Sequence, residues 1–476
     1  MGVEALRAPD RHTLSPETAV FTLLSFEGPD LYSRAGGLGV RVTQLASALA
    51  RAGYHTHLVF VGDPAAPGME VQEEGRLHLH RWCQWISRYY PQGVYEGEDA
   101  KRYDFDETVP DFVTGQIARR AVEEGKVLVV LAEEWHTAHT VCELSDRLWG
   151  AGLRHHALLA WNANNTMGFD RINWGRLGYV TTVTTVSRYM KHVMWGRGIN
   201  PVVIPNGIAD EALRPVPPRS VGVLRKGLEG AGGRVLLVKV GRFDPDKRWL
   251  MAVEAVALLK AQGMAPKMVI RGGIEPHEQE VLGRASGLGL RTMPVHLESH
   301  ATSSELAQVI SAHPEVDVFQ LKFFVSDNLL RTLYQAADAV LANSGIEPFG
   351  LVGLEVMGAG GLPITGATGE DYAIAYHNAI VLETDDPREI AYHVRRVVHD
   401  PALSQKLREN GRATAARYTW SHVLPILVDR LQFAAEQQRL VWPQLRSTRE
   451  DGGGGRRRPE GAGEVKEAAA ALEEVR

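Results

Sequence analysis

Short apolar runs rich in β-branched residues recur along the first half of the chain and predict buried strands. Segments of helical periodicity at 40–52 and 113–124 lie between them. The predicted strands are at 20–25, 56–62, 127–132, 157–161, 181–186 and 201–204. Because continuous apolar strands are typical of parallel sheets with both faces covered by helices, this half is predicted to be an α/β domain.

The same rhythm restarts after a stretch that is rich in proline and glycine and poor in apolar residues, which indicates a domain boundary. The strands predicted beyond it are at 235–240, 268–271, 316–319, 339–342, 363–365 and 380–382. Helical patterns fall between them at 249–262, 304–312, 329–337, 351–359 and 387–398. Two doubly wound Rossmann-like halves are therefore predicted, with a ligand in a cleft at the carboxyl ends of the strands.

These patterns divide the chain into segments. We predict an N-terminal domain over 1–210, a linker over 211–233 and a C-terminal domain over 234–416. Apolar residues at helical spacing predict a closing helix within 417–445 that returns to the N-terminal domain. The remaining residues, 446–476, are Gly-rich and then charged, and are predicted to be a disordered tail.

Composition narrows the class of protein. Hydrophobic residues make up 44% and charged residues 23% of the chain, and no uncharged apolar run reaches the roughly 20 residues of a membrane span. With 52 basic and 57 acidic side chains the net charge is −5, which opposes a dedicated nucleic-acid binder. Cys83 and Cys142 lie in separate segments, so neither a disulfide scaffold nor a thiolate zinc site is predicted. The start lacks an export signal, and we expect a cytoplasmic protein.

The most specific chemical signal is a pair of carboxylates, Glu347 and Glu355, directly after a predicted strand and turn. If a helix begins near Gly350, its free amides at Gly350 and Leu351 and its positive end suit a phosphate. Glu355, inside that helix, is placed to accept hydrogen bonds from a hydroxylated group such as ribose. An ordinary amphipathic helix with an acidic start is the alternative.

This spacing resembles the Glu-x7-Glu motif of retaining GT-B glycosyltransferases, the group in glycosyltransferase family 4 and its relatives that includes glycogen and starch synthases and sucrose synthase. The segment Gly-Arg-Phe-Asp-Pro-Asp-Lys is similar to the loop that follows the first strand of their C-terminal domain. The resemblance implies that Arg242 and Lys247 hold the nucleotide diphosphate and that Glu347 orients the hydroxyls of the donor sugar. A solvated basic turn is the alternative.

A glycine-rich turn follows the first predicted strand. Its sequence, Ser-Arg-Ala-Gly-Gly-Leu-Gly, resembles the Lys-Thr-Gly-Gly-Leu-Gly loop of the synthases, with Arg34 in place of the lysine. Gly36, Gly37 and Gly39 let backbone amides approach a diphosphate closely. A dinucleotide-binding enzyme is the rival interpretation, but the third glycine of that fingerprint is absent.

Two segments are expected on the side of the acceptor or of the transferred sugar. Glu134 and His136 stand in a stretch that looks like the Asp-Trp-His-Thr segment of the synthases. Many relatives carry a histidine that contacts the donor sugar where this chain has Trp161 and Asn162. An amide can hydrogen-bond a hydroxyl but cannot titrate, so Asn162 is a candidate for positioning substrate. Alternatively, it satisfies backbone groups in a turn.

The remaining motifs either have two interpretations or give no evidence for a metal site or a nucleophile. An aromatic cluster could stack on an acceptor sugar or pack against the N-terminal domain: Trp82, Trp85, Tyr89, Tyr90 and Tyr95. Two Asp-x-Asp pairs, Asp104 with Asp106 and Asp244 with Asp246, lie in a charged loop and in the basic turn, and no metal site is predicted from them. Neither a Gly-x-Ser-x-Gly elbow nor a Walker loop occurs.

Together, the motifs predict a retaining, metal-independent hexosyltransferase without a cofactor. It would move a hexose, expected to be glucose, from a nucleotide sugar such as UDP-glucose or ADP-glucose to a hydroxyl acceptor such as a glucan or small sugar. The resemblance to the synthases spans about residues 20–435. A catalytically inactive sugar-binding or regulatory protein, a phosphorylase and an epimerase on the same scaffold are the alternatives. The donor base, the acceptor and the oligomeric state stay open.

Overall fold

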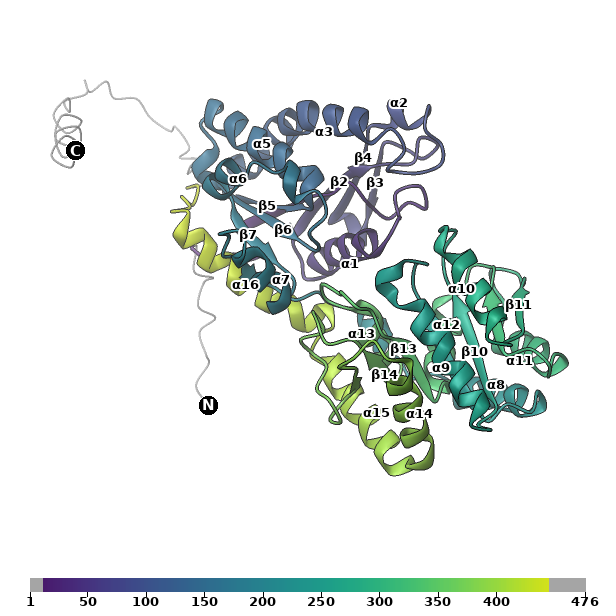
Figure 1. Ribbon diagram of the computed structural model, residues 1–476. Coiled ribbons are helices and arrows are strands. Elements are labelled where there is room, and N and C mark those ends of the chain that lie inside the picture. The colour runs from purple at the N-terminus through teal and green to yellow at the C-terminus, as the bar shows by residue number, and fades with distance from the viewer. Residues whose placement is uncertain (1–11, 445–476) are drawn as a thin grey trace, which may run out of the picture. The chain divides into compact units, whose positions relative to one another are not determined.

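The computed structural model describes residues 12–444, in which strands and helices alternate along the chain. The strands form two sheets, parallel throughout except for the edge pair of β3 with β4. Figure 1 shows helices on both sides of each sheet. The predicted α/β class with two Rossmann-like domains is confirmed, while the predicted tail over 446–476 lies outside the described residues.

The N-terminal sheet has the strand order β3-β4-β2-β1-β5-β6-β7-β8. Every residue of β1 and β5, at its centre, is buried, because helices cover both faces. The strands are β1 (Ala19–Leu24), β2 (His55–Val61), β3 (Met69–Gln72), β4 (Leu77–Trp82), β5 (Val127–Glu133), β6 (Ala157–Ala163), β7 (Thr182–Thr185) and β8 (Val202–Val203). The sequence pattern misses β3 and β4, since polar residues interrupt them.

Two apolar clusters hold helices against the two faces of this sheet. Leu45 of α1 belongs to one cluster, and Phe105 of α3 and Val141 of α5 belong to the other. The helices are α1 (Gly37–Arg51), α2 (Gln84–Ser87), α3 (Glu98–Phe112), α4 (Arg119–Glu123), α5 (Ala138–Gly150), α6 (Trp174–Val180) and α7 (Arg188–Trp195). The helical pattern predicted at 113–124 forms a π-helical turn that leads from α3 into α4.

The C-terminal sheet has the order β11-β12-β10-β9-β13-β14-β15. Its strands are β9 (Val235–Val240), β10 (Pro266–Arg271), β11 (Thr292–Val295), β12 (Val318–Leu321), β13 (Ala339–Ala342), β14 (Pro363–Thr365) and β15 (Ile380–Val381). Strand β9 pairs in parallel with β10 on one side and β13 on the other. The loops that follow β9 and β13 therefore leave the same edge of the sheet next to each other.

Helices with clear start signals cover this second sheet. Thr302 and Glu305 form a reciprocal capping box at the start of α11, and Asp386 caps α14 ahead of Pro387. The helices are α8 (Pro218–Gly230), α9 (Trp249–Ala261), α10 (His277–Gly287), α11 (Ser303–Ala312), α12 (Asp327–Ala336), α13 (Leu351–Gly358), α14 (Pro387–His399) and α15 (Pro401–Ala416).

The structure differs from the expected linker over 211–233. Helix α8 takes up most of this segment, and its Leu224 and Leu228 are buried in one apolar cluster with Leu306 of α11. The prolines that seemed to interrupt structure begin the helix instead, because Pro218 occupies its first turn, where a missing N–H costs nothing.

Helix α16 (Trp420–Gln437) leads from the C-terminal domain to the N-terminal one. Its Leu427 and Leu431 lie in the same apolar cluster as Leu45 of α1, and Thr419 forms a parallel bridge with Ile208. The closing helix expected within 417–445 is thus observed as a helix packed on the first sheet.

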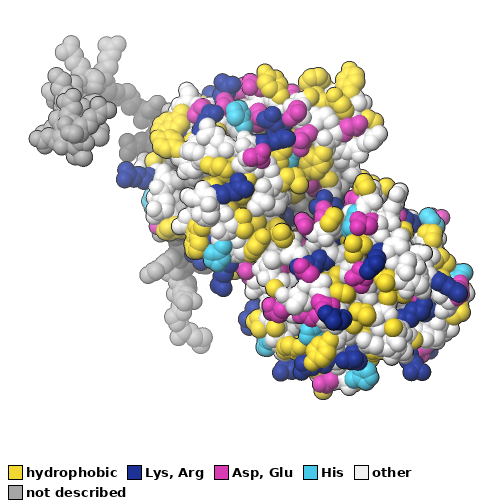
Figure 2. Space-filling model, viewed as in Figure 1, with side chains coloured by type: hydrophobic (Ala, Val, Ile, Leu, Met, Phe, Trp, Pro, Cys, Tyr) yellow, Lys and Arg dark blue, Asp and Glu magenta, His cyan; other side chains and the backbone are white. Residues whose placement is uncertain are grey.

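Surface charge is mixed. On the face shown in Figure 2, basic and acidic side chains are interspersed over the described residues, without a continuous basic patch on that face. No helix among residues 12–444 combines the length and the apolar character that crossing a bilayer requires.

Four histidines of β2 and β4 stack on one face of the first sheet: His55, His57, His78 and His80. His57 Nδ1 and His80 Nε2 are 3.0 Å apart and share a hydrogen bond. Burial, followed by the neighbouring histidines, lowers the pKa of His57 to about 3, and burial lowers that of His80 to about 4. The folded state therefore holds this pair neutral.

This array predicts a pH-dependent contribution to stability. The unfolded chain protonates His57 and His80 below about pH 6.5 and the folded chain does not, so this pair by itself should lower the free energy of unfolding by about 2 to 4 kcal/mol from pH 7 to pH 5. Urea unfolding at several pH values measures the slope. Replacing both His57 and His80 by leucine should remove this pair's part of the slope, whereas His399→Gln, at an exposed position of α14, should leave the slope unchanged. An unchanged slope in the double variant would contradict this interpretation.

Candidate active site

An ion pair joins the loops that follow β9 and β13. Lys247 Nζ donates to Glu347 Oε2 at 2.5 Å, and both side chains are about one fifth to one quarter exposed, at 26% and 19%. The two loops also share a backbone bond from the amide of Gly345 to the carbonyl of Asp246, at 2.7 Å. Adjacent parallel strands thus bring together two of the predicted site residues.

The third residue predicted at this place, Arg242, lies on the loop after β9 and is exposed to solvent. Its guanidinium is 57% exposed and lies 4.0 Å from the carboxylate of Asp244. The backbone around it is held, since its carbonyl accepts a hydrogen bond from Trp249 Nε1 at 2.7 Å. Asp244 caps the short turn by accepting from the amide of Asp246. Arg242 is therefore an exposed cation on an anchored loop, accessible to an anionic ligand.

Helix α13 begins where the sequence predicts. Gly350 is its N-cap, with φ +78°, and a side chain there would also come within 2.6 Å of Glu370. Glycine is thus required for both conformation and space. The amides at the start of α13 sit beside Glu347, whose own amide donates to Thr368 Oγ1 at 2.8 Å.

Glu370 is a site residue that the sequence analysis did not select. It is 6% exposed, and burial together with the charge of Glu347 raises its pKa to about 8. It accepts a hydrogen bond from the amide of Thr368 at 3.2 Å. A carboxyl with a pKa raised in this way favours its protonated form at neutral pH and is then able to donate a hydrogen bond, next to Glu347. Its position in a glycine-rich turn, residues 366–370, was the available signal.

Glu355 lies on α13, as predicted, and is half-buried. Burial and then the charge of Asp327 raise the pKa of its carboxyl to about 7. The nearby hydroxyl of Tyr334 is buried and has no hydrogen-bond partner in the described part of the chain. Glu355 is therefore able to accept hydroxyl donors from a ligand.

The glycine-rich turn at the start of α1 already holds an anion of its own. Glu27 Oε2 accepts hydrogen bonds from the amides of Ala35, Gly36 and Gly39, at 3.0 to 3.2 Å. Its second oxygen, Oε1, accepts from the hydroxyl of Tyr95 at 2.6 Å. The sequence analysis did not select Glu27, because nothing in the sequence shows that it folds back onto the turn.

Three glycine amides of this turn were expected to face a diphosphate. Two of them, those of Gly36 and Gly39, donate to Glu27 instead, and that of Gly37 lies between them. A side chain at Gly37 would lie 4.0 Å from Leu351 of α13, so this turn approaches the start of that helix. The amides of Gly37 and Leu38 make no hydrogen bond within residues 12–444, and these are the groups of the turn that remain open to a ligand.

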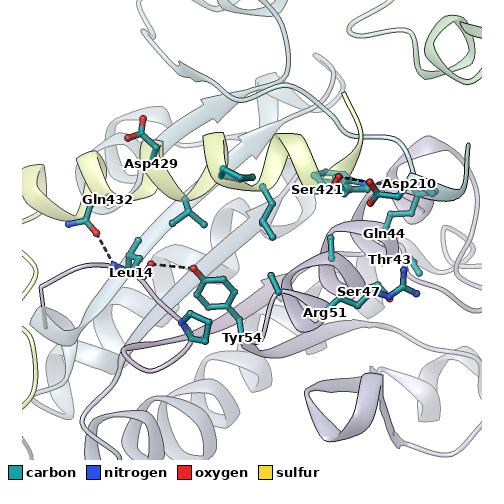
Figure 3. A pocket seen from close by; sticks show the side chains of 18 of the residues that line it. Leu14, Thr43, Gln44, Ser47, Arg51, Tyr54, Asp210, Ser421, Asp429 and Gln432 are labelled. Carbon is teal, nitrogen blue, oxygen red and sulfur yellow. Dashed lines mark hydrogen bonds between the residues drawn. The ribbon is translucent and has the colours of Figure 1, made fainter. Parts of the chain in front are cut away.

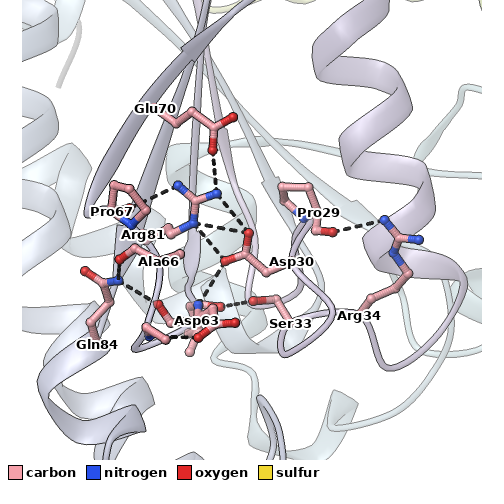
Figure 4. A network of polar contacts seen from close by, with 12 residues as sticks. Pro29, Asp30, Ser33, Arg34, Asp63, Ala66, Pro67, Glu70, Arg81 and Gln84 are labelled. Carbon is pink, nitrogen blue, oxygen red and sulfur yellow. Dashed lines mark hydrogen bonds and ion pairs between the residues drawn. The ribbon is translucent and has the colours of Figure 1, made fainter.

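Figure 4 shows how the loop before this turn is anchored. Arg81 of β4 grips Asp30 with both Nε and Nη2, at 2.9 to 3.1 Å, and also donates to Glu70 at 2.7 Å. Arg34, predicted to bind the donor, donates to the carbonyl of Pro29 at 3.0 Å and is exposed. The loop is thus fixed at one end by Arg81 and carries an exposed cation, Arg34, at the other.

Glu134 is buried at the end of β5, with φ +66°. Burial raises the pKa of its carboxyl to about 8. It accepts from the amide of Asn164 at 2.6 Å. His136 is buried too: its Nε2 lies 2.7 Å from Glu98 Oε1, and its ring stacks on Phe26 with centroids 4.6 Å apart.

Asn162 sits in a buried hydrogen-bond network. Its Nδ2 donates to Glu133 Oε2 at 2.9 Å, and its Oδ1 accepts from Thr184 at 2.9 Å. Glu133 in turn pairs with Arg41 at 3.1 Å. Both ends of the amide are engaged, which favours the alternative in which Asn162 supports the local fold. The neighbouring Asn164 Oδ1 is the buried amide oxygen here that lacks a partner among the described residues.

A pocket of about 850 Å³ lies between α1 and α16, apart from all these residues. Figure 3 shows that side chains from α1, such as Ser47, face those of α16, such as Gln432, which accepts from the amide of Leu14 at 2.9 Å. None of the predicted site residues lines it. This pocket is therefore separate from the residues that the sequence predicts for the site.

Comparisons with known proteins match both halves of the chain to glycosyltransferase families. Residues 35–212 match the family described as Glycosyltransferase Family 4, and residues 223–414 match the family described as Glycosyl transferases group 1. A D-inositol 3-phosphate glycosyltransferase from Geodermatophilus obscurus is 26% identical over 333 residues. The match spans 68% of this chain and 66% of that protein, just under two thirds of its length.

Solved structures show the same fold. Sucrose-phosphate synthase from Thermosynechococcus elongatus superposes with a TM-score of 0.60 and 21% identity, over 88% of this chain and 100% of that one. HepE from Anabaena, solved in complex with UDP-glucose, superposes with a TM-score of 0.59 and 14% identity, over 87% of this chain and 99% of that one.

The hold of Glu27 on the glycine turn is testable. Glu27→Gln replaces a charged acceptor by a neutral one, so the amides of Ala35, Gly36 and Gly39 should exchange with solvent about five- to tenfold faster. Hydrogen exchange followed by mass spectrometry measures this. Glu229→Gln, at an exposed position of α8, is the control. Equal exchange rates in the wild type and the Glu27 variant would show that the carboxylate does not hold the turn.

Proposed function

Since the chain is a GT-B glycosyltransferase that combines a family 4 domain with a group 1 domain, we propose that it transfers a hexosyl group from a nucleotide-diphosphate sugar to a hydroxyl group of a small carbohydrate acceptor. The observation that carries this proposal is the contact between Lys247 and Glu347 at the carboxyl ends of neighbouring strands. A cation for the diphosphate and a carboxylate for the sugar hydroxyls stand there side by side.

The diphosphate is the leaving group of the proposed reaction. As the bond from the sugar C1 to the phosphate oxygen breaks, negative charge grows on that oxygen. Lys247, Arg242 and the amides of Gly350 and Leu351 are the groups proposed to stabilise it, because preorganised donors act most strongly on charge that develops in the transition state. Glu355 would hold the ribose through its carboxylate.

We propose that the transfer retains the configuration at C1 and needs no metal ion. The acceptor hydroxyl forms the new bond to C1, and its proton passes to the leaving phosphate oxygen on the same face. This route requires no protein nucleophile. Glu134 has a carboxyl that is protonated near neutral pH and lies beside the acceptor-side segment, so it would serve as a hydrogen-bond donor to a hydroxyl.

The identities of donor and acceptor follow by analogy only. HepE was solved with UDP-glucose, which makes that donor the first to test alongside ADP-glucose and GDP-sugars. The names of two similar proteins, D-inositol 3-phosphate glycosyltransferase and sucrose-phosphate synthase, suggest phosphorylated sugars or cyclitols as the first acceptors to test.

Two substitutions test the assignment of the ion pair. Lys247→Ala and Glu347→Gln should each lower kcat/KM by about 100- to 1,000-fold, since each removes a group that acts on the transition state. Lys226→Ala, at an exposed position of α8, should keep full activity. Circular dichroism must show that the variants are folded. Near-normal turnover in either variant would remove that residue from the proposed site.

The stereochemical course is tested by proton NMR of the product. With an α-linked donor such as UDP-glucose, the new linkage should be α, and a β linkage would contradict retention. Transfer should persist after exhaustive treatment with EDTA. A protein that binds nucleotide sugars in a thermal-shift screen, yet turns none over with any acceptor, would instead be an inactive sugar-binding protein.

A further inference from the structure

Lys239 is a buried cation within an otherwise apolar strand. It is the fifth residue of β9 and only 2% exposed, an environment in which a lysine is rare unless its amine is satisfied. Its Nζ donates to Asn343 Oδ1 at 2.6 Å and to the carbonyl of Leu341 at 3.1 Å. It also lies 4.9 Å from the centre of the Trp249 ring.

Through Asn343 this amine reaches both loops of the candidate site. Asn343 is fully buried at the start of the loop that carries Glu347, and its Nδ2 donates to the carbonyl of Arg248 at 3.3 Å. Arg248 directly follows Lys247. The base of one loop is therefore tied to the base of the other, below the ion pair between Lys247 and Glu347.

No negative charge is paired with Lys239. Its amine forms no ion pair with a carboxylate among the described residues, and the carbonyl, amide and ring that it contacts are neutral. Burial, together with the positive charges of Lys247 and Arg248, holds its pKa well below the usual range, while the charge of Glu347 acts in the opposite direction. A negative charge that arrives at Lys247 would favour the protonated form of Lys239.

We propose that Lys239 is a positioning residue for the diphosphate of the donor: through Asn343 it sets the spacing between the loop of Lys247 and the loop of Glu347. This inference rests on the proposed function of the same site. Lys239 does not itself touch the substrate. It acts by keeping the cation and the carboxylate at the separation that the bound donor requires.

The C-terminal domain offers a matched control in Lys267. This lysine, on the neighbouring strand β10, is 5% exposed, and its Nζ donates to the carbonyls of Pro314 and Val316 at 2.6 and 2.5 Å. It stands at the amino-terminal part of its strand, at the edge of the sheet opposite to the site loops. A purely structural role for a buried lysine should affect both positions alike.

The test compares Lys239→Met with Lys267→Met. Methionine keeps the length and apolar stem of lysine and removes the amine. Calorimetric titration of the wild type with UDP, ADP and GDP identifies the nucleotide that binds most tightly. The affinity of the Lys239 variant for that nucleotide should be lower by about tenfold or more, the loss expected for a hydrogen bond that involves a charged group. The Lys267 variant should bind within about twofold of the wild type. The same order should appear in KM for the donor.

A second measurement is the number of protons that the protein takes up when it binds the nucleotide. Titrations in buffers of different ionisation enthalpy should show that the wild type and the Lys267 variant take up protons when the nucleotide binds, and that Lys239→Met takes up fewer. Asn343→Leu breaks the same link from β13 and replaces Lys239→Met if that variant does not fold. The double variant should bind no more weakly than Asn343→Leu alone.

The results distinguish failure of the proposed role of Lys239 from failure of the proposed function. Wild-type-like binding and proton uptake by Lys239→Met, an equal loss in both lysine variants, or additive losses in the double variant would overturn the role of Lys239 while leaving the proposed function in place. Failure of the wild type itself to bind any of the three nucleotides would overturn the proposed function, and the positioning role with it.

Discussion

The ion pair of Lys247 with Glu347 depends on the pairing of β9 with β13, and the candidate site depends on both. The two residues are 100 positions apart in the sequence, and the pairing of the two strands brings their loops together. Parallel pairing places both strand ends at one edge of the sheet, and the buried Lys239–Asn343 contact ties the loops at their base. Cation and carboxylate thus meet in a partly exposed position that a ligand can reach.

Two carboxylates of the protein bind the cation and the backbone amides that the sequence predicts for an anionic ligand. Glu347 neutralises Lys247, and Glu27 accepts three amides of the glycine turn. Glu370, close to Glu347, avoids a second negative charge because burial and repulsion favour its protonated form. In the proposed reaction, a diphosphate that binds here would have to replace some of these charge-assisted bonds with its own.

Local patterns predicted most of the elements that carry the site. The apolar runs at 235–240 and 339–342 match β9 and β13, and a helix was expected from Gly350, where α13 indeed starts. The same reasoning missed β4, whose histidines and Arg81 break the apolar pattern, although in the fold His80 shares a hydrogen bond with His57 and Arg81 donates to Asp30. It also took the prolines before α8 for a linker, because proline marks a helix start and a loop equally well.

The sequence by itself determined the alternation of strands and helices, the two-domain α/β class, and which residue types stand at the strand ends. Burial periodicity and the conformational limits of glycine and proline act over a few neighbouring residues, so they can be read locally. Only the tertiary structure decided which groups pair: Glu27 with the glycine-turn amides, Asn162 with Glu133, and Lys239 with Asn343. Such partners are chosen by strand order and packing, which bring together residues that are distant along the chain.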